Sequence, residues 1–294
     1  MLKIKKLIIP FINQFSISKN WLHPNGAKKL NLDNSSAPLV SVITIVRNEE
    51  ETIEKTLLSV ANQSYKNFEF IVIDGLSTDG TTALLNKHNK LISKWVSEKD
   101  ENSTQAANKG ICLAKGEIIF VLSADDWIKK DTLAAIVDGF NKNKNYSFVY
   151  GDMTMVFGSN LSLICGDYDY KENIKKGNPS FNYPSVAYKK NIFDKVGLFS
   201  STFPWNSDYE FLVRLYANNL NGKYIPKFNV YRLPGGQGES NMMGSLIHIL
   251  NINYIYKLPL FKPLVKNLKS LCAMYLLQIL PKGIKILLKM ILRK

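Results

Sequence analysis

Acidic side chains follow the apolar runs in the middle of this 294-residue chain, where each run gives way to a polar loop. Asp74 follows FIVI, Asp100 comes shortly after WVSE, and the pair Asp125–Asp126 follows FVLSA. Converging carboxylates repel one another unless a cation bridges them, and Mg²⁺ or Mn²⁺ bound to one or two carboxylates keeps positions for phosphate oxygens. The pattern therefore predicts a hard divalent cation with a diphosphate ligand. The alternative for each Asp is a cap on the helix that follows it.

A further carboxylate, Asp208, stands directly before the apolar run YEFLVRL. A carboxylate within hydrogen-bond reach of a hydroxyl can take up its proton as a general base. Asp208 or Ser207 can equally cap a helix here, with Glu210 adding favourable charge at its N-terminus. The spacing alone leaves both roles open.

Strand-like runs alternate with helical patterns up to residue 152, and these elements must position the acids. Near-continuous apolar runs, typical of strands covered on both faces, fall at 39–46, 68–73, 95–98, 117–123 and 147–152. Asn48 is expected to cap a helix whose first turn is 49–51, and further helices are expected at 104–114 and from Asp131. This β-α-β order predicts an open sheet with a ligand site at the carboxyl ends of its strands.

The alternation weakens from Met153 onward. We expect a hairpin around Gly158 and Asn160, then a strand within NYPSVAYKK. A helix is expected from Ser207 to about Asn218. We interpret this part of the chain as the half that binds the acceptor of a reaction.

The formal net charge of +14 is concentrated at the two ends of the chain. Of the 38 basic residues, 15 lie in residues 1–32 and 251–294, which contain no acidic residue; the other 23 share residues 33–250 with all 24 acidic ones. A nucleic-acid-binding protein is expected to carry basic residues across its folded surface. The near-neutral middle therefore argues against nucleic acid as a partner, although the tails alone would fit it.

Lysines alternate with apolar residues after Leu260, as in amphipathic helices interrupted at Pro263 and Pro281. The longest uncharged apolar stretch there is about ten residues, whereas a spanning helix needs about 20. Lysines near an anionic leaflet contribute about 1 kcal/mol each. We therefore expect peripheral contact with an anionic membrane surface, and we interpret residues 1–37 as a second peripheral segment rather than a signal peptide. The alternative is a basic helical cap on the domain.

The three cysteines and three histidines are scattered and form no pattern typical of a metal site. An odd number of cysteines without a CxxC motif favours neither a disulfide framework nor a thiolate zinc site. A reducing cytoplasm fits this usage best.

Three segments, in this order, resemble the family 2 glycosyltransferases, which have the GT-A fold: VSVITIVRNEEETIEKTLLSVANQSYKNFEFIVIDGLSTDGT, SEKDENSTQAANKGICLAKGEIIFVLSADDW and NSDYEFLVRL. They span about residues 39–215. The chain looks most like the bacterial surface-polysaccharide group, which carries VIDGxSTDGT and an NKG helix. The resemblance implies an α/β fold with a Rossmann-like mixed sheet flanked by helices.

The resemblance also implies roles for the acids of the first half. Asp125 would approach the ribose of a nucleotide-sugar donor and Asp126 would ligate Mg²⁺ or Mn²⁺ on its diphosphate. Asp74 would contact the nucleoside, and the donor side would be lined by three further residues, Asp100, Asn108 and Lys109. The alternative for Asn108 and Lys109 is ordinary helix surface.

The resemblance matches Asp208 with the family's catalytic base. It implies an inverting transfer from a nucleotide sugar, with UDP as the family's commonest nucleotide. We expect the transfer to be non-processive, because the lack of a run long enough to span a membrane disfavours a polymer-extruding synthase. The acceptor would be a lipid-linked oligosaccharide or polysaccharide in the assembly of a surface glycan such as O-antigen, lipopolysaccharide or capsule, at the cytoplasmic face of the membrane.

The expected organisation of the chain has four parts. Residues 1–37 form a basic N-terminal segment, and residues 38–152 the nucleotide-sugar-binding half. Residues 153–240 form the acceptor-binding half, and residues 241–294 an amphipathic basic tail that associates with membranes.

Two other classes of function remain as alternatives. Close relatives carry Gly, Tyr and Asp where this chain has Asn102, Thr104 and Gln105, so a catalytically impaired scaffold that only binds the nucleotide sugar is one of them. A nucleotidyltransferase is the other, but such enzymes usually carry a glycine-rich phosphate loop after the first strand. Here that place reads RNEEETIE, without glycine.

Overall fold

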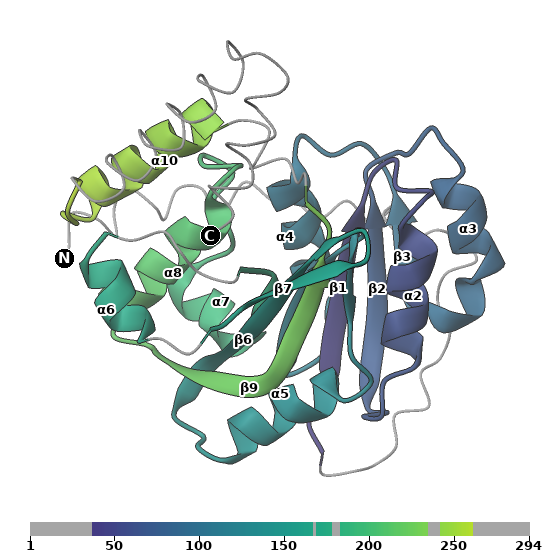
Figure 1. Ribbon diagram of the computed structural model, residues 1–294, viewed down its shortest axis with the longest axis horizontal. Helices are drawn as coiled ribbons and strands as arrows, with labels where there is room; N and C mark the ends of the chain where they lie inside the picture. The colour runs from purple at the N-terminus through teal and green to yellow at the C-terminus, as the bar shows by residue number, and fades with distance from the viewer. Residues whose placement is uncertain (1–36, 167–168, 178–182, 235–241, 261–294) are drawn as a thin grey trace.

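The computed structural model describes residues 37–166, 169–177, 183–234 and 242–260, which form three layers with one mixed sheet between two layers of helices (Figure 1). The sheet has nine strands in the order β3-β2-β1-β4-β8-β6-β9-β5, and β7 pairs with β6 beside this path. The fold is therefore α/β with a mixed sheet, as the sequence predicts.

Four parallel strands make up the first half of the sheet. They are β1 (Val40–Val46), β2 (Phe68–Asp74), β3 (Lys94–Ser97) and β4 (Ile118–Ser123), and they pair in the order β3-β2-β1-β4. The runs that predict these four strands are confirmed to within one residue at each end, whereas the fifth run, 147–152, is the first part of a longer strand. Because the four strands run in one direction, the loops that carry the acids leave the sheet at one edge.

Two separate hydrophobic clusters cover the two faces of the sheet. One holds α2 (Ile53–Ala61), α3 (Thr81–Lys87) and α5 (Thr132–Asn141). The other holds α4 (Ser103–Leu113), α6 (Tyr170–Lys175), α7 (Asn191–Val196), α8 (Ser207–Ala217) and α10 (Met242–Ile255). β1 contributes side chains to both clusters, Val42 to the first and Ile43 to the second. Because both faces of this strand are covered, its sequence is apolar almost throughout.

The second half of the sheet is mostly antiparallel. β8 (Val186–Lys189) runs against β4 and against β6 (Tyr146–Phe157), which turns into β7 (Asn160–Ile164). β9 (Asn221–Arg232) lies along β6 and ends against β5 (Asp126–Ile128). The predicted hairpin around Gly158 is confirmed. β6 also runs through the expected boundary after residue 152, so the two halves of the chain share one sheet.

Gly151 allows β9 to approach β6 closely at an irregularity in their pairing. A Cβ built on Gly151 would lie only 1.9 Å from the carbonyl oxygen of Phe228, so any side chain here would force the two strands apart. The β6–β9 register shifts at this point, between Tyr150 and Asp152. Beyond this point the last residues of β9 pair with β5, which contains Asp126.

The prediction that Asn48 caps a helix at residues 49–51 is wrong. Helix α2 begins at Ile53, and Asn48 has a left-handed backbone with φ of 54°. Its side-chain oxygen accepts a hydrogen bond of 2.8 Å from the amide of Thr78, while the Glu50 carboxylate accepts one of 2.6 Å from the amide of Gly80. Both side chains hold the loop after β2, and these long-range bonds replace the local cap.

None of the helices in the described ranges has the length and apolar character needed to cross a membrane. The peripheral segments predicted at residues 1–37 and after Leu260 fall almost entirely on residues 1–36 and 261–294. These lie outside the described residues, so both stay predictions.

Candidate active site

The predicted acids are distributed along the carboxyl edge of the parallel strands. Asp74 ends β2, and Asp125–Asp126 follow β4, with β1 lying between those two strands. Since neighbouring strands are about 4.8 Å apart, the two positions are about 10 Å apart along the edge. This spacing suits an extended ligand, with one end at β2 and the other at β4.

Asp74 is fully buried and bonds to both flanking loops. Its carboxylate accepts hydrogen bonds of 2.5 Å from the hydroxyls of Ser77 and Ser97, and one of 3.2 Å from the amide of Ser77. These bonds tie the loop after β2 to the end of β3. The edge near Asp74 is therefore firmly held in its present shape.

Asp100 and Lys109 form a buried ion pair beside Asp74. The ammonium of Lys109 lies 2.6 Å from Asp100 Oδ1 and also contacts Glu98. Burial raises the pKa of Asp100 above its ordinary value, and Lys109 opposes this. For Lys109, burial lowers the pKa, but Asp100 and Glu98 outweigh it and the pKa is raised. The two carboxylates of Asp100 and Glu98 thus share one ammonium group, that of Lys109.

A close helix–strand approach brings Lys109 to this position. A Cβ built on Gly110 would lie 2.3 Å from the Ile43 side chain, so only glycine lets α4 pack this closely on β1. The NKG sequence therefore has a physical basis in this packing.

The side-chain amide of Asn108 forms two hydrogen bonds with the backbone of Phe199. It donates 2.8 Å to the carbonyl of Phe199 and accepts 3.0 Å from the Phe199 amide. Its side chain thus positions the loop that leads to α8. The expected contact of Asn108 with a donor stays a prediction.

The Asp125–Asp126 pair lies in the tight turn between β4 and β5. The Thr56 hydroxyl, from α2, lies 2.7 Å from the carbonyl oxygens of both Ala124 and Asp126 and fixes the backbone of this turn. Asp125 is half-buried, whereas Asp126 is completely buried. Burial raises the pKa of Asp126 well above its ordinary value, Asp125 raises it further, and the charge of Arg232 opposes both.

Asp126 has the properties expected of a metal ligand. Within the described part of the chain, neither of its carboxylate oxygens has a hydrogen-bond partner, although both are buried. A divalent cation would satisfy such oxygens. No group of three or more His, Cys, Asp or Glu side chains gathers as a metal site among the described residues, so a cation at Asp126 would need further oxygens from a ligand such as a diphosphate.

Asp208 lies in the first turn of α8. This helix covers one face of the sheet, and α2 covers the other. The amide of Tyr209 donates to its Oδ1 at 2.7 Å, and Thr104 on α4 bonds to the neighbouring Ser207 at 3.0 Å. Burial raises the pKa of Asp208 to about 6, while the Tyr209 amide and the charge of Arg232 hold it down. A carboxyl with this pKa is ionised at neutral pH and can still take up a proton, as a general base requires.

Arg232 is a site residue that the sequence analysis missed. It pairs with Asp126 across β5 and β9, and opposite residues of antiparallel strands point to the same face. Its charge also acts on Asp208, so one cation lies near both carboxylates. The available signal was a single Arg at the end of the strand-like run KFNVYR, followed in the sequence by LPGG.

Arg47 is a second basic residue absent from the predictions. It follows β1, between the two sets of acids, and its side chain is exposed. Its stem packs beside Gly75, where a built Cβ would lie 3.4 Å from Arg47 Cδ. The position suits contact with an anion lying along the edge.

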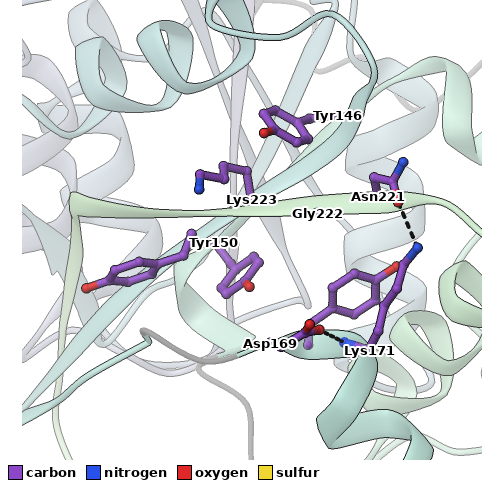
Figure 2. A pocket seen from close by; sticks show the side chains of 9 residues that line it. Tyr146, Tyr150, Asp169, Lys171, Asn221, Gly222 and Lys223 are labelled. Atoms are coloured by element: carbon purple, nitrogen blue, oxygen red, sulfur yellow. Dashed lines mark hydrogen bonds between the residues drawn. The ribbon is translucent and has the colours of Figure 1, made fainter.

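A separate hollow of about 370 Å³ lies at the other end of β9 (Figure 2). Its lining includes Tyr146 and Tyr150 of β6, and Lys171 of α6 reaches across to Asn221 at 2.7 Å. Asn221 and Arg232 are the two ends of β9, so this hollow is far from the acids. None of the predicted site residues lines it.

A family model described as glycosyl transferase family 2 matches residues 41–197, which include all the predicted donor-side residues but not Asp208. A PGL/p-HBAD biosynthesis glycosyltransferase of Mycobacterium bovis is 27% identical over 187 residues, covering 62% of this chain and 72% of the relative. An uncharacterized glycosyltransferase of Mycobacterium tuberculosis is 30% identical over 184 residues, covering 61% of this chain and 70% of the relative.

Solved structures show the same fold. The S. aureus TarS 1-349 structure in complex with UDP-GlcNAc has a TM-score of 0.58 at 19% identity, with 73% of this chain and 65% of that chain covered. This chain thus spans slightly less than two thirds of that structure. The mannosyltransferase PcManGT from Pyrobaculum calidifontis, in complex with GDP-Man and Mn²⁺, has a TM-score of 0.59 at 20% identity, covering 79% and 69%. The predicted GT-A architecture is confirmed.

Proposed function

The chain belongs to glycosyl transferase family 2, and on that premise we propose that it moves a sugar from a nucleoside-diphosphate donor to an acceptor. UDP is the favoured nucleotide of the donor. The acceptor is a lipid-linked glycan or a polysaccharide, and the reaction takes part in the synthesis of a bacterial surface glycan. The observation that carries the proposal is the buried Asp126 carboxylate, whose oxygens have no hydrogen-bond partner among the described residues. The positive charge of Arg232 lies near both Asp126 and Asp208.

The donor lies along the carboxyl edge of the sheet in this proposal. Its nucleoside occupies the end near Asp74, where Asp100 and Lys109 form the neighbouring wall, and its ribose approaches Asp125. Its diphosphate reaches Asp126. The spacing of about 10 Å between the two ends matches an extended nucleoside diphosphate.

Asp126 would hold a divalent cation, Mg²⁺ or Mn²⁺, together with the donor's diphosphate. The cation, when bound, neutralises negative charge on the leaving diphosphate. Arg232 adds a positive charge from the protein on the same face of the sheet, and Arg47 supplies another at the end of β1.

Asp208 acts as the general base of a single displacement. It takes the proton of the acceptor hydroxyl while that oxygen bonds to the anomeric carbon, and the bond between this carbon and the diphosphate oxygen breaks with its electron pair leaving on the diphosphate. Attack from the face opposite the leaving group inverts the anomeric configuration. The proposal also keeps the protein at the cytoplasmic face of the membrane, where a lipid-linked acceptor is available.

The test is a release assay for nucleoside diphosphate. The full chain is incubated with a panel of UDP-, GDP- and dTDP-sugars, with and without Mn²⁺, and with membrane lipid extract as acceptor; NMR of the product then gives its anomeric configuration. We expect metal-dependent release from one donor and an inverted product. Binding of a nucleotide sugar without any turnover would overturn the proposal in favour of the scaffold alternative.

A further inference from the structure

Helix α10 presents an uncharged apolar surface to solvent. Residues 242–255 read MMGSLIHILNINYI, without a single Asp, Glu, Lys or Arg. Met243, Ile247 and Tyr254 are 55%, 51% and 76% exposed, and they lie at positions that share one helix stripe. The sequence analysis expected an amphipathic basic tail from residue 241; its first helix carries no basic side chain, and the exposed Asn251 is the polar member of its outer stripe.

The opposite side of α10 is firmly fixed to the body of the protein. Ile249 and Ile252 are buried in the cluster that also contains α8. Asn253 is fully buried, accepts 2.6 Å from the Tyr209 hydroxyl and donates 2.9 Å to the carbonyl of Pro259. The helix therefore cannot turn its apolar stripe inward without breaking these buried bonds.

The buried bonds also connect α10 to the candidate base. Tyr209 directly follows Asp208, and the Tyr256 hydroxyl, just past α10, donates 2.8 Å to Glu210 on the next position of α8. The Trp205 ring, on the loop before α8, stacks on His248 of α10 with ring centroids 4.8 Å apart. Figure 1 shows α10 lying over α8 at the upper left of the molecule. Whatever binds the outer stripe of α10 is thus held in a fixed relation to Asp208.

The charge of the chain indicates what that partner is. Lys257 lies two residues past the end of α10, and residues 251–294 contain eight lysines and one arginine but no acid. An apolar stripe continued by basic residues complements an anionic lipid leaflet, which takes apolar side chains at its headgroup boundary and attracts lysines at its surface. A second protein surface would need acidic groups to match the same residues.

We propose that the outer stripe of α10 is the surface that docks on the anionic membrane leaflet, lying flat because a 14-residue helix is about 21 Å long and too short to span it. This rests on the proposed function, because it places the base Asp208 next to the leaflet that holds a lipid-linked acceptor. The docking surface is rigid and belongs to the folded domain, in addition to the basic segments.

The experiment measures binding of the full chain to vesicles of phosphatidylcholine with about 30% phosphatidylglycerol. One variant combines Ile247→Glu and Tyr254→Glu, and a second combines Ile247→Ser and Tyr254→Ser, which removes apolar surface without adding charge. Leu58→Glu on α2 is the matched control, since Leu58 is 43% exposed on the other face of the sheet. Release of nucleoside diphosphate in solution is measured for each protein.

We expect both double variants to bind vesicles at least about tenfold more weakly, while Leu58→Glu binds like the wild type. Donor turnover in solution should be unchanged in all of them. Equal vesicle binding by the serine variant would overturn the proposal, because only charge would then matter. A wild type that is dimeric without vesicles and becomes monomeric in the double variants would also overturn it, since a second copy would then cover α10.

Failure of the docking surface can be distinguished from failure of the proposed function. A wild type that turns over a donor but ignores vesicles overturns only the docking proposal. A wild type that binds vesicles through α10 but turns over no nucleotide sugar overturns only the proposed function.

Discussion

Replacing Asp208 by Asn should stabilise the protein and inactivate it. Burial raises the pKa of this carboxyl from 3.8 to about 6. The unfolded chain therefore ionises Asp208 more readily than the folded chain does, so its ionisation destabilises the fold: the penalty is absent below pH 3.8 and complete above about pH 6. A shift of about two pKa units corresponds to about 3 kcal/mol. Because Asp208 is only half-buried, we expect about 1–2 kcal/mol.

The assay is urea unfolding at two pH values. Asn keeps the size of the side chain and an oxygen for the Tyr209 amide, so Asp208→Asn should raise the free energy of unfolding by about 1–2 kcal/mol at pH 8 and change it little near pH 4. The rate of sugar transfer should fall about 100-fold or more, as expected on loss of a general base. Asp138→Asn on α5 is the control, because Asp138 is exposed, and it should change neither quantity.

Two results would refute this reasoning. If Asp208→Asn and the wild type have the same stability at pH 8, burial does not disfavour the ionised carboxylate. If the variant keeps full transfer activity, Asp208 is not the base, whatever its stability.

Three further predictions concern the charged groups around the donor edge. Asp126→Asn should weaken the binding of UDP by about 100-fold in the presence of Mn²⁺ and change metal-free binding little, since a neutral amide is a poor ligand for a hard cation. Isothermal titration of UDP with and without Mn²⁺ measures the two affinities. Equal losses of affinity with and without Mn²⁺ would contradict the prediction. Arg232 holds down the pKa of Asp208, so Arg232→Gln should move the acidic limb of the pH–rate profile to a higher pH than the wild-type midpoint expected at about 6. Arg232→Lys keeps the positive charge and should largely keep the wild-type midpoint. An unmoved midpoint in the Gln variant would show that Arg232 does not act on the base. Lys109→Met should lower the free energy of unfolding by about 3 kcal/mol, measured in urea at pH 8, because it leaves the Asp100 and Glu98 carboxylates without their ammonium partner. Lys130→Met, at an exposed lysine, is the control. A loss of stability no larger than in this control would contradict a stabilising role for the buried ion pair.

The parallel half of the fold was predictable because its signals are local. Each strand from β1 to β4 is a continuous apolar run that ends at a polar loop, so the runs themselves mark the edge where Asp74 and Asp126 lie. The β6–β7 hairpin was likewise marked by Gly158, which has φ of 61° in the turn.

The parts that sequence reasoning missed depend on pairing between distant segments. Asn48 looked like a helix cap, yet its actual partner is the backbone of Thr78, 30 residues away. Arg232 reaches Asp126 only because β9 lies between β6 and β5 in the sheet, and no local pattern reveals that strand order. Asn108 was identified by its motif, but its bonds to Phe199 join segments 91 residues apart.

The assignment of two carboxylates to two tasks is tested most directly by one measurement: steady-state release of nucleoside diphosphate by the wild type, Asp126→Asn and Asp208→Asn, each over a range of donor concentrations with Mn²⁺. The wild type should turn over a nucleotide sugar. Asp208→Asn should lose kcat with little change in the donor's KM, and Asp126→Asn should lose apparent donor affinity as well. Wild-type activity in either variant, or an identical kinetic defect in both, would contradict the separation of donor binding at Asp126 from proton transfer at Asp208.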